Sequence, residues 1–180
     1  MSKVGKILLG IGFFFSFLSL SFMITIVLAI FALVTYPLGS LCRSIGWILF
    51  GRNRKIQYVA TGISILILFP VVITGILQSD FLIETFGLTV GQSIAISLVA
   101  WSFYSIIELS SYYSLAKADN KLFYGAMIST IGIIIVLGNI GNVLQSTNPL
   151  DSLGAVYYAL YFLIVSSLLA MVGSFKSKEE

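Results

Sequence analysis

Residues 122–144 read LFYGAMISTIGIIIVLGNIGNVL, which is 23 residues without a charge. A helix of this length measures about 35 Å, and the hydrocarbon core of a bilayer measures roughly 30 Å. Four further uncharged stretches, each longer than the roughly 18 residues that a span requires, lie at 7–42, 56–79, 85–107 and 152–175. The pattern predicts an all-α fold, a polytopic integral membrane helical bundle.

The composition supports the same class. Of 180 residues, 58% are hydrophobic and 9% are charged, whereas a soluble domain carries about 25% charged residues. Ten Lys/Arg and seven Asp/Glu are too few to cover a water-exposed surface of this size. We therefore expect lipid to surround most of the chain, and membrane lipids to be its first partners.

The absence of certain residue types narrows the chemistry. The sequence has no His, which excludes His-ligated metal or haem and a His general base. Its one cysteine, Cys42, excludes an internal disulfide and any Cys-clustered metal site. The net charge of +3 is too small to indicate nucleic acid. We expect no cofactor, no metal and no catalytic residue.

We expect one transmembrane domain over residues 1–180, with five spans at about 7–35, 56–78, 87–108, 122–144 and 153–174. Eight Lys/Arg fall in the segments 43–55, 109–121 and the C-terminal tail. The loops on the opposite side, 79–86 and 145–152, contain no Lys or Arg. Loops rich in Lys/Arg stay in the cytoplasm. This asymmetry predicts a multi-pass protein of the cell membrane with a cytoplasmic C-terminus.

The N-terminal stretch 7–42 allows two interpretations. Its 36 residues would form about 54 Å of helix, nearly twice what one span needs. A single long, tilted helix over 7–35 gives five spans but leaves Lys3 and Lys6 outside. Two short spans with a turn near residues 19–21 place both lysines inside, yet that turn lacks Gly, Pro, Asn and Asp. Five spans are favoured, and six are the alternative.

Glu108 is the first candidate for a functional polar group. It ends the predicted span 87–108 on the cytoplasmic side, and ionisable groups within a bilayer are costly and often functional. The other interpretation is an ordinary interfacial carboxylate, within reach of headgroups and of Lys117 or Lys121. The sequence favours the interfacial role over a proton or cation site.

Asn139 and Asn142 are the second candidates, near the outer end of 122–144. Residues three apart share a helix face, and Gly138 and Gly141 beside them leave room for a neighbouring backbone. Hydrogen bonding between helices is the favoured role. Lining a path for a cation or polar solute is the alternative.

Pro70 lies inside the predicted span 56–78, where it removes one backbone hydrogen bond and predicts a helix kink. The kink shapes the packing in the favoured interpretation and frames a hinge in the other.

The basic residues of the segment 43–55 are Arg43, Arg52, Arg54 and Lys55. They predict contacts with acidic lipid headgroups or act as topology signals.

Two neighbouring stretches carry a resemblance. Residues 107–116 read IELSSYYSLA, and residues 121–126 read KLFYGA before the IGII of 131–134. The Leu-x-x-x-Tyr helix end and the Leu-Phe-x-x-Ala start of an Ile/Gly-rich helix resemble small multi-spanning archaeal membrane proteins of unknown function. The resemblance covers about 30 residues. It implies an archaeal cell membrane and brings no activity, cofactor or site.

The scarcity of ionisable groups beside faces of small residues favours a non-enzymatic function. We expect an accessory or structural subunit that packs with a second copy or with other membrane subunits. The alternative is a small transporter or channel whose path is lined by Glu108, Asn139 and Asn142. A membrane enzyme working through Glu108, Asp119 or tyrosines is the least favoured interpretation.

Overall fold

A computed structural model describes residues 3–25, 29–51, 56–77, 79–115 and 120–176, and these residues form seven helices and no strand. Six helices are long and apolar enough to span a membrane: α1 (Lys3–Ile24), α2 (Ala29–Gly51), α3 (Ile56–Leu77), α5 (Val90–Leu115), α6 (Asn120–Gln145) and α7 (Pro149–Lys176). The seventh, α4 (Ser79–Phe86), has only 8 residues. The predicted all-α membrane bundle is confirmed.

The N-terminal region forms two helices. Helix α1 ends at Ile24 and α2 begins at Ala29, so the favoured single helix over 7–35 does not form. The alternative of six spans fits the structure, although the first helix ends beyond the expected turn at 19–21. Helix α2 continues to Gly51 and so includes much of the segment 43–55, which the sequence had assigned to a loop. A second full-length span results.

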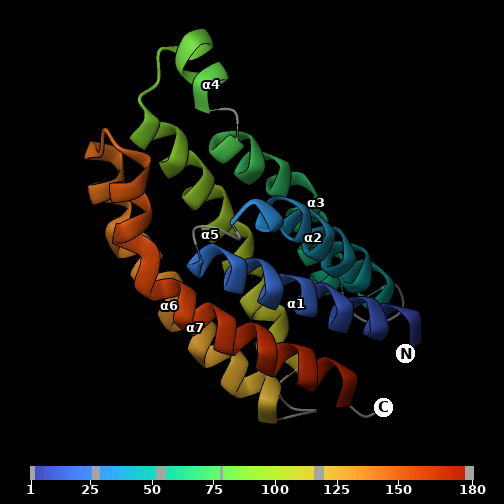
Figure 1. Ribbon diagram of the computed structural model, residues 1–180. Coiled ribbons are helices and arrows are strands. Elements are labelled where there is room, and N and C mark those ends of the chain that lie inside the picture. The colour runs from blue at the N-terminus through green and yellow to red at the C-terminus, as the bar shows by residue number, and fades with distance from the viewer. Residues whose placement is uncertain (1–2, 26–28, 52–55, 78, 116–119, 177–180) are drawn as a thin grey trace.

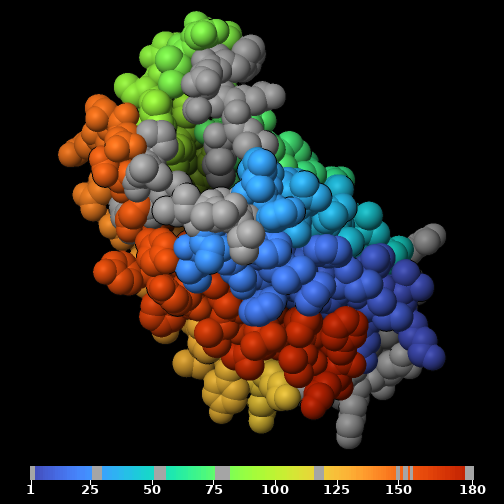
Figure 2. Space-filling model, in the orientation of Figure 1, coloured from blue at the N-terminus to red at the C-terminus, as the bar shows by residue number. Residues whose placement is uncertain are grey.

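The six long helices form a closed ring. Each packs against its neighbour in the order α1, α2, α3, α5, α6, α7, and α7 packs back against α1. Figure 2 shows α7 lying directly against α1 at the surface. The two termini lie at the same end of the bundle, and α4 stands at the other end, where it contacts α3 and α5 (Figure 1).

The outside of the ring is apolar and its inside carries many polar groups. Ile30 and Phe103 are 67% and 64% exposed, and many other large apolar side chains face outward. A water-soluble monomer rarely exposes so large an apolar surface. Among the described residues, eleven serines and one threonine are buried together with Arg43 and Glu108. This arrangement suits a protein whose solvent is lipid.

Glycines hold α1 and α2 in backbone contact. Gly5 lies against Gly46, and Gly12 lies against Gly39, so the two helices meet twice at a spacing of seven residues. A Cβ atom on Gly12 would lie 2.7 Å from the backbone nitrogen of Arg43, and one on Gly46 would lie 2.8 Å from a backbone nitrogen of α1. Side chains larger than hydrogen do not fit there. The contact places Arg43 beside α1.

A capped turn fixes where α5 begins. Gly87 has φ of 66°, and its N–H donates to the Ile83 carbonyl at 2.9 Å, which ends α4 in the left-handed conformation that glycine favours. Thr89 Oγ1 then accepts from the Gln92 N–H at 3.2 Å, and Gln92 Oε1 accepts from the Thr89 N–H at 2.8 Å. This reciprocal capping box starts α5 at Val90.

Candidate functional site

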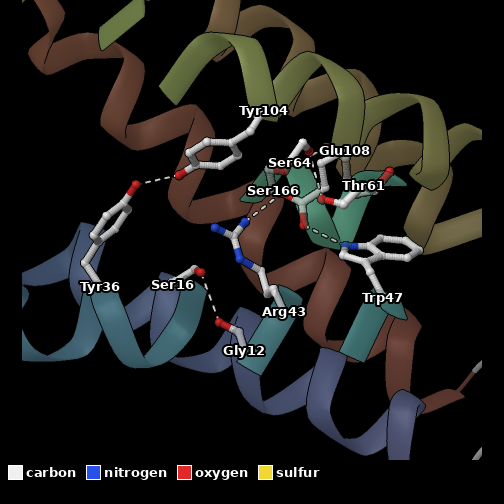
Figure 3. A network of polar contacts seen from close by, with 11 residues as sticks. Gly12, Ser16, Tyr36, Arg43, Trp47, Thr61, Ser64, Tyr104, Glu108 and Ser166 are labelled. Carbon is white, nitrogen blue, oxygen red and sulfur yellow. Dashed lines mark hydrogen bonds and ion pairs between the residues drawn. The ribbon is translucent and has the colours of Figure 1, made fainter. Parts of the chain in front are cut away.

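An ion pair lies inside the ring, between α2 and α5. Arg43 Nη1 donates to Glu108 Oε2 at 2.8 Å (Figure 3). Arg43 is 9% exposed and Glu108 is 3% exposed. Helix α5 continues for seven residues beyond Glu108 and ends at Leu115, so the carboxylate lies about 10 Å from the helix end. Both charges are therefore well inside their spans.

Trp47 supplies a second donor to the same carboxylate. Its Nε1 donates to Glu108 Oε1 at 2.9 Å, so each carboxylate oxygen accepts one hydrogen bond. Trp47 lies four residues after Arg43, and residues at this spacing share one face of a helix. A buried carboxylate that lacked such donors would cost several kcal/mol. Helix α2 thus presents both a charge and an indole to Glu108.

Aromatic rings surround the pair. Trp47 stacks on Tyr58 of α3, with ring centroids 5.5 Å apart, and meets Tyr112 of α5 edge-on at 5.8 Å. The guanidinium carbon of Arg43 lies 5.6 Å from the Phe13 ring and 6.0 Å from the Tyr104 ring. Such cation–π contacts stabilise a desolvated cation and fix the plane of the guanidinium.

A second contact joins α2 and α5. The hydroxyls of Tyr36 and Tyr104 form a hydrogen bond, as the left side of Figure 3 shows. Tyr36 lies seven residues before Arg43, and Tyr104 lies four residues before Glu108, so this bond is on one side of the ion pair. Trp47 and Tyr112, each four residues after one of the charges, are on the other side.

A small polar cavity borders the pair. It measures about 50 Å³, which is room for a few water molecules or one small ion. Helices α1, α2, α5, α6 and α7 all contribute to its wall. Besides Arg43 and Glu108, its polar lining consists of five serines and two tyrosines: Ser16, Ser105, Ser129, Ser166, Ser167, Tyr36 and Tyr112.

The Arg43 guanidinium has an N–H donor that no acceptor in the described residues satisfies. A guanidinium has five N–H donors. Its Nε is buried and has no hydrogen-bond partner within the described part of the chain. A buried donor left unpaired costs about 1–3 kcal/mol. The site therefore contains a donor that an incoming acceptor could satisfy.

Two expectations for these charges were wrong. Glu108 is not an interfacial carboxylate near headgroups, because α5 carries it two turns inside the bundle, where it pairs with Arg43. Arg43 is not exposed for headgroup contact, because it is buried against Phe13 and Tyr104; its role as a topology signal stays a prediction. The other basic residues of that segment, Arg52, Arg54 and Lys55, lie outside the described residues, as does Lys117.

The two asparagines lie apart from this site. Asn139 Nδ2 donates to the Ile135 carbonyl at 2.8 Å, and Asn142 Nδ2 donates to Asn139 Oδ1 at 3.3 Å, all within α6. Neither lines the cavity. A Cβ atom on Gly138 or Gly141 would meet nothing within 4 Å, so no described helix of this chain occupies the space beside them.

Pro70 lies inside α3, exposed on the outer surface of the bundle. No described residue of α3 lines the cavity. The kink predicted at Pro70 would therefore change the shape of α3 and not the lining of the site. The kink itself stays a prediction.

Trp47, Tyr36 and the serines of the cavity were not predicted as site residues from the sequence. A signal for the pair was present, since Arg43 is the one charge between residues 7 and 51 and Glu108 is the one charge between 85 and 116. Two overlong apolar stretches that each hold one charge of opposite sign indicate a pair across helices.

Comparisons with protein-family models, with curated proteins and with solved structures find no match for this chain. In the described ranges, no group of three or more Cys, Asp or Glu side chains is placed to hold a metal ion.

Proposed function

We propose that this multi-pass membrane protein is a small transporter, and that the Arg43–Glu108 pair with its cavity is the solute site. The observation that supports the proposal is the buried ion pair beside a polar cavity, inside a closed ring of membrane-spanning helices. Paired ionisable groups that face the interior of a helix bundle commonly mark solute or ion pathways. The proposed role is non-enzymatic.

A purely structural role accounts less well for the same geometry. Replacing a buried ion pair with apolar residues of similar volume is often neutral or stabilising, so such a pair is weak support for a fold. A cavity beside the charges would also not be expected for a purely structural role, because empty volume in a packed interior lowers the stability of the folded protein. The cavity and the unpaired Arg43 Nε both suit a site that a solute occupies.

The contacts on either side of the pair correspond to two gates. If the basic ends of the helices lie in the cytoplasm, the Tyr36–Tyr104 bond is on the outer side of the ion pair. The stack of Trp47 on Tyr58 and its contact with Tyr112 are then on the inner side. In this proposal the structure is taken as the occluded state, and transport requires each side to open in turn.

The proposed orientation follows from the number of spans. An even number puts both termini on one side, which agrees with their common end in Figure 1. Lys3, Lys6 and Lys176 then lie with the cytoplasmic basic segments, as the positive-inside rule requires. We place the protein in the cell membrane with a cytoplasmic C-terminus, and the resemblance noted above suggests an archaeal membrane.

Reconstitution tests the transport proposal. Purified protein in liposomes is mixed rapidly with potassium chloride, potassium formate, urea or glycerol, and light scattering reports solute entry. At least one solute should enter faster than into protein-free liposomes, and Glu108→Gln should abolish the difference. Glu84→Gln, which changes an exposed carboxylate on α4, is the matched control and should behave as the parent protein. Parent rates equal to those of empty liposomes for every solute would overturn the proposal.

A specific observation also favours the accessory or structural subunit expected from the sequence. The outer face of α6 has open space over Gly138 and Gly141, with the exposed amide of Asn142 beside them. A second copy or another membrane subunit could approach closely there. Light scattering of the purified complex tests this: Gly141→Leu should shift an oligomer toward the monomer, and an unchanged mass would count against the role.

A further inference from the structure

We infer that the site binds a small monovalent anion together with a proton, the anion on Arg43 and the proton on Glu108. This inference rests on the proposed transport function and specifies its solute class. The observations that carry it are the cavity beside the ion pair and the unpaired Nε of the buried guanidinium.

Charge balance couples the two ligands. In the occluded structure the site is neutral, because Arg43 and Glu108 neutralise each other at 2.8 Å. An anion added to this pair would bring a net negative charge into a medium where unpaired charges cost several kcal/mol. If Glu108 takes up a proton, Arg43 becomes the charge without a partner, and an anion restores neutrality. The site therefore favours proton and anion together over either alone.

The donors around the cavity suit an anion. Among the described residues the Arg43 Nε has no partner, and Ser105, Ser129 and Ser167 also line the space. The hydroxyls of Ser16 and Ser166 line it too, but they already donate to the Gly12 and Gly125 carbonyls, at 3.0 and 2.9 Å. Figure 3 shows the guanidinium of Arg43 between the Ser16 side of the site and Glu108. The volume of about 50 Å³ admits a halide or a formate-sized carboxylate but not a sugar acid.

A cation fits the same site poorly. Both oxygens of Glu108 already accept hydrogen bonds, from Arg43 and from Trp47. Within the described part of the chain, no second carboxylate lines the cavity, and a cation there would lie beside the Arg43 charge. The electrostatics therefore select a negative solute.

The other titratable groups near the pair are tyrosines. Helix α2 contributes Tyr36, α5 contributes Tyr104 and Tyr112, and α3 contributes Tyr58 through its stack on Trp47. The described residues by which α1, α6 and α7 line the cavity are serines and apolar side chains. Glu108 is thus the one carboxyl group among the described residues that line the cavity.

The two tryptophans of the chain make binding observable. Trp47 donates to Glu108, and Trp101 lines the cavity, so intrinsic fluorescence reports on the site. The purified protein in detergent is titrated with sodium chloride, sodium formate or sodium gluconate, and proton uptake is followed in weakly buffered solution. Chloride or formate should give a saturable change with one proton taken up per anion bound, and gluconate should give none. A lack of saturation with both small anions, or binding without proton uptake, would overturn the inference.

Three variants sharpen the test. In Glu108→Gln the anion should bind without proton uptake, and chloride should raise the melting temperature because Arg43 lacks its partner. The double variant Arg43→Gln/Glu108→Gln keeps the site neutral and should bind chloride about ten- to 100-fold more weakly than Glu108→Gln, which is the effect of losing a charged hydrogen bond. Equal affinity in these two variants would refute binding on Arg43. Glu84→Gln should match the parent protein.

Binding and flux separate the two proposals. Anion binding without any solute flux in liposomes would refute transport and leave the anion site standing. Flux of urea or glycerol without anion binding would refute the anion site and leave transport standing.

Discussion

Replacing one residue of the Arg43–Glu108 pair should destabilise the protein more than replacing both. Glu108→Gln keeps the shape of the side chain but replaces one acceptor oxygen with an NH₂ group. Arg43 Nη1 and Trp47 Nε1 both donate to this side chain, so in the variant one of them faces another donor. Arg43 also stays charged and buried without a counterion.

These contacts set the size of the effect. The lost hydrogen bond to a charged group contributes about 1.5–3 kcal/mol. With the unpaired charge included, removal of one partner from a buried pair costs about 3–5 kcal/mol of unfolding free energy. Arg43→Gln should cost a similar amount because it leaves the Glu108 carboxylate unpaired. The double variant removes both charges and should cost only about 1–3 kcal/mol, less than either single change.

The assay is reversible unfolding by SDS in mixed micelles, followed by far-UV circular dichroism. Gluconate replaces chloride in the buffer, so that no small anion can stand in for Glu108. The parent protein, the two single variants and the double variant form a double-mutant cycle. Glu84→Gln is a separate control for the loss of one carboxylate. Single variants whose free-energy losses simply add up in the double variant would refute the pairing, because independent residues behave additively.

Three further predictions concern other parts of the fold. Gly46→Ala should cost about 1–3 kcal/mol of unfolding free energy in the SDS titration, because its Cβ would lie 2.8 Å from the backbone of α1. Gly138→Ala has open space around its Cβ and should be neutral or slightly stabilising in the same assay. Trp47→Phe should cost about 1.5–3 kcal/mol through the lost bond to the carboxylate while keeping the stack on Tyr58, and an unchanged stability would contradict that bond. Tags at the N- and C-termini should both be protected from a membrane-impermeant reagent in intact cells, and labelling of the N-terminal tag alone would restore the five-span interpretation.

The sequence predicted the C-terminal spans closely. The stretch 122–144 corresponds to α6 at Asn120–Gln145, and 56–78 corresponds to α3 at Ile56–Leu77. Bilayer thickness sets the length of such helices, and an apolar stretch that ends at loop residues leaves little freedom in placing them. The fold class could therefore be read from composition and charge spacing alone.

The prediction failed where a charge was taken as the end of a span. Arg43 was assigned to the basic segment 43–55 outside the spans, and Glu108 ended the predicted span 87–108, although α2 includes Arg43 and α5 continues past Glu108. A charge ends a span only when it has to reach water, and these two charges satisfy each other across 65 residues of sequence. The single opposite charge in each long apolar stretch indicates such a pair, but the residues next to Arg43 or Glu108 do not identify its partner.

The packing of α1 and α2 was missed for a related reason. Gly5 and Gly12 meet Gly46 and Gly39 at a spacing of seven residues, and this packing was not among the expectations from the sequence. Glycines at this spacing also lie on one helix face, but which pairs meet depends on how two helices cross. The same holds for the serines of the cavity, which come from four helices.

The backbone contact between α1 and α2 has a consequence for how the protein is made. Arg43 is synthesised 65 residues before Glu108, which at 5–20 residues per second is a delay of about 3–13 s. During that time an arginine in the middle of a span costs about 2.5–3.5 kcal/mol of insertion free energy. The Gly12–Gly39 contact holds α1 against Arg43, and the Phe13 ring lies over its guanidinium. Helices α1 and α2 together thus lower the cost of the buried Arg43 cation until Glu108 has been synthesised.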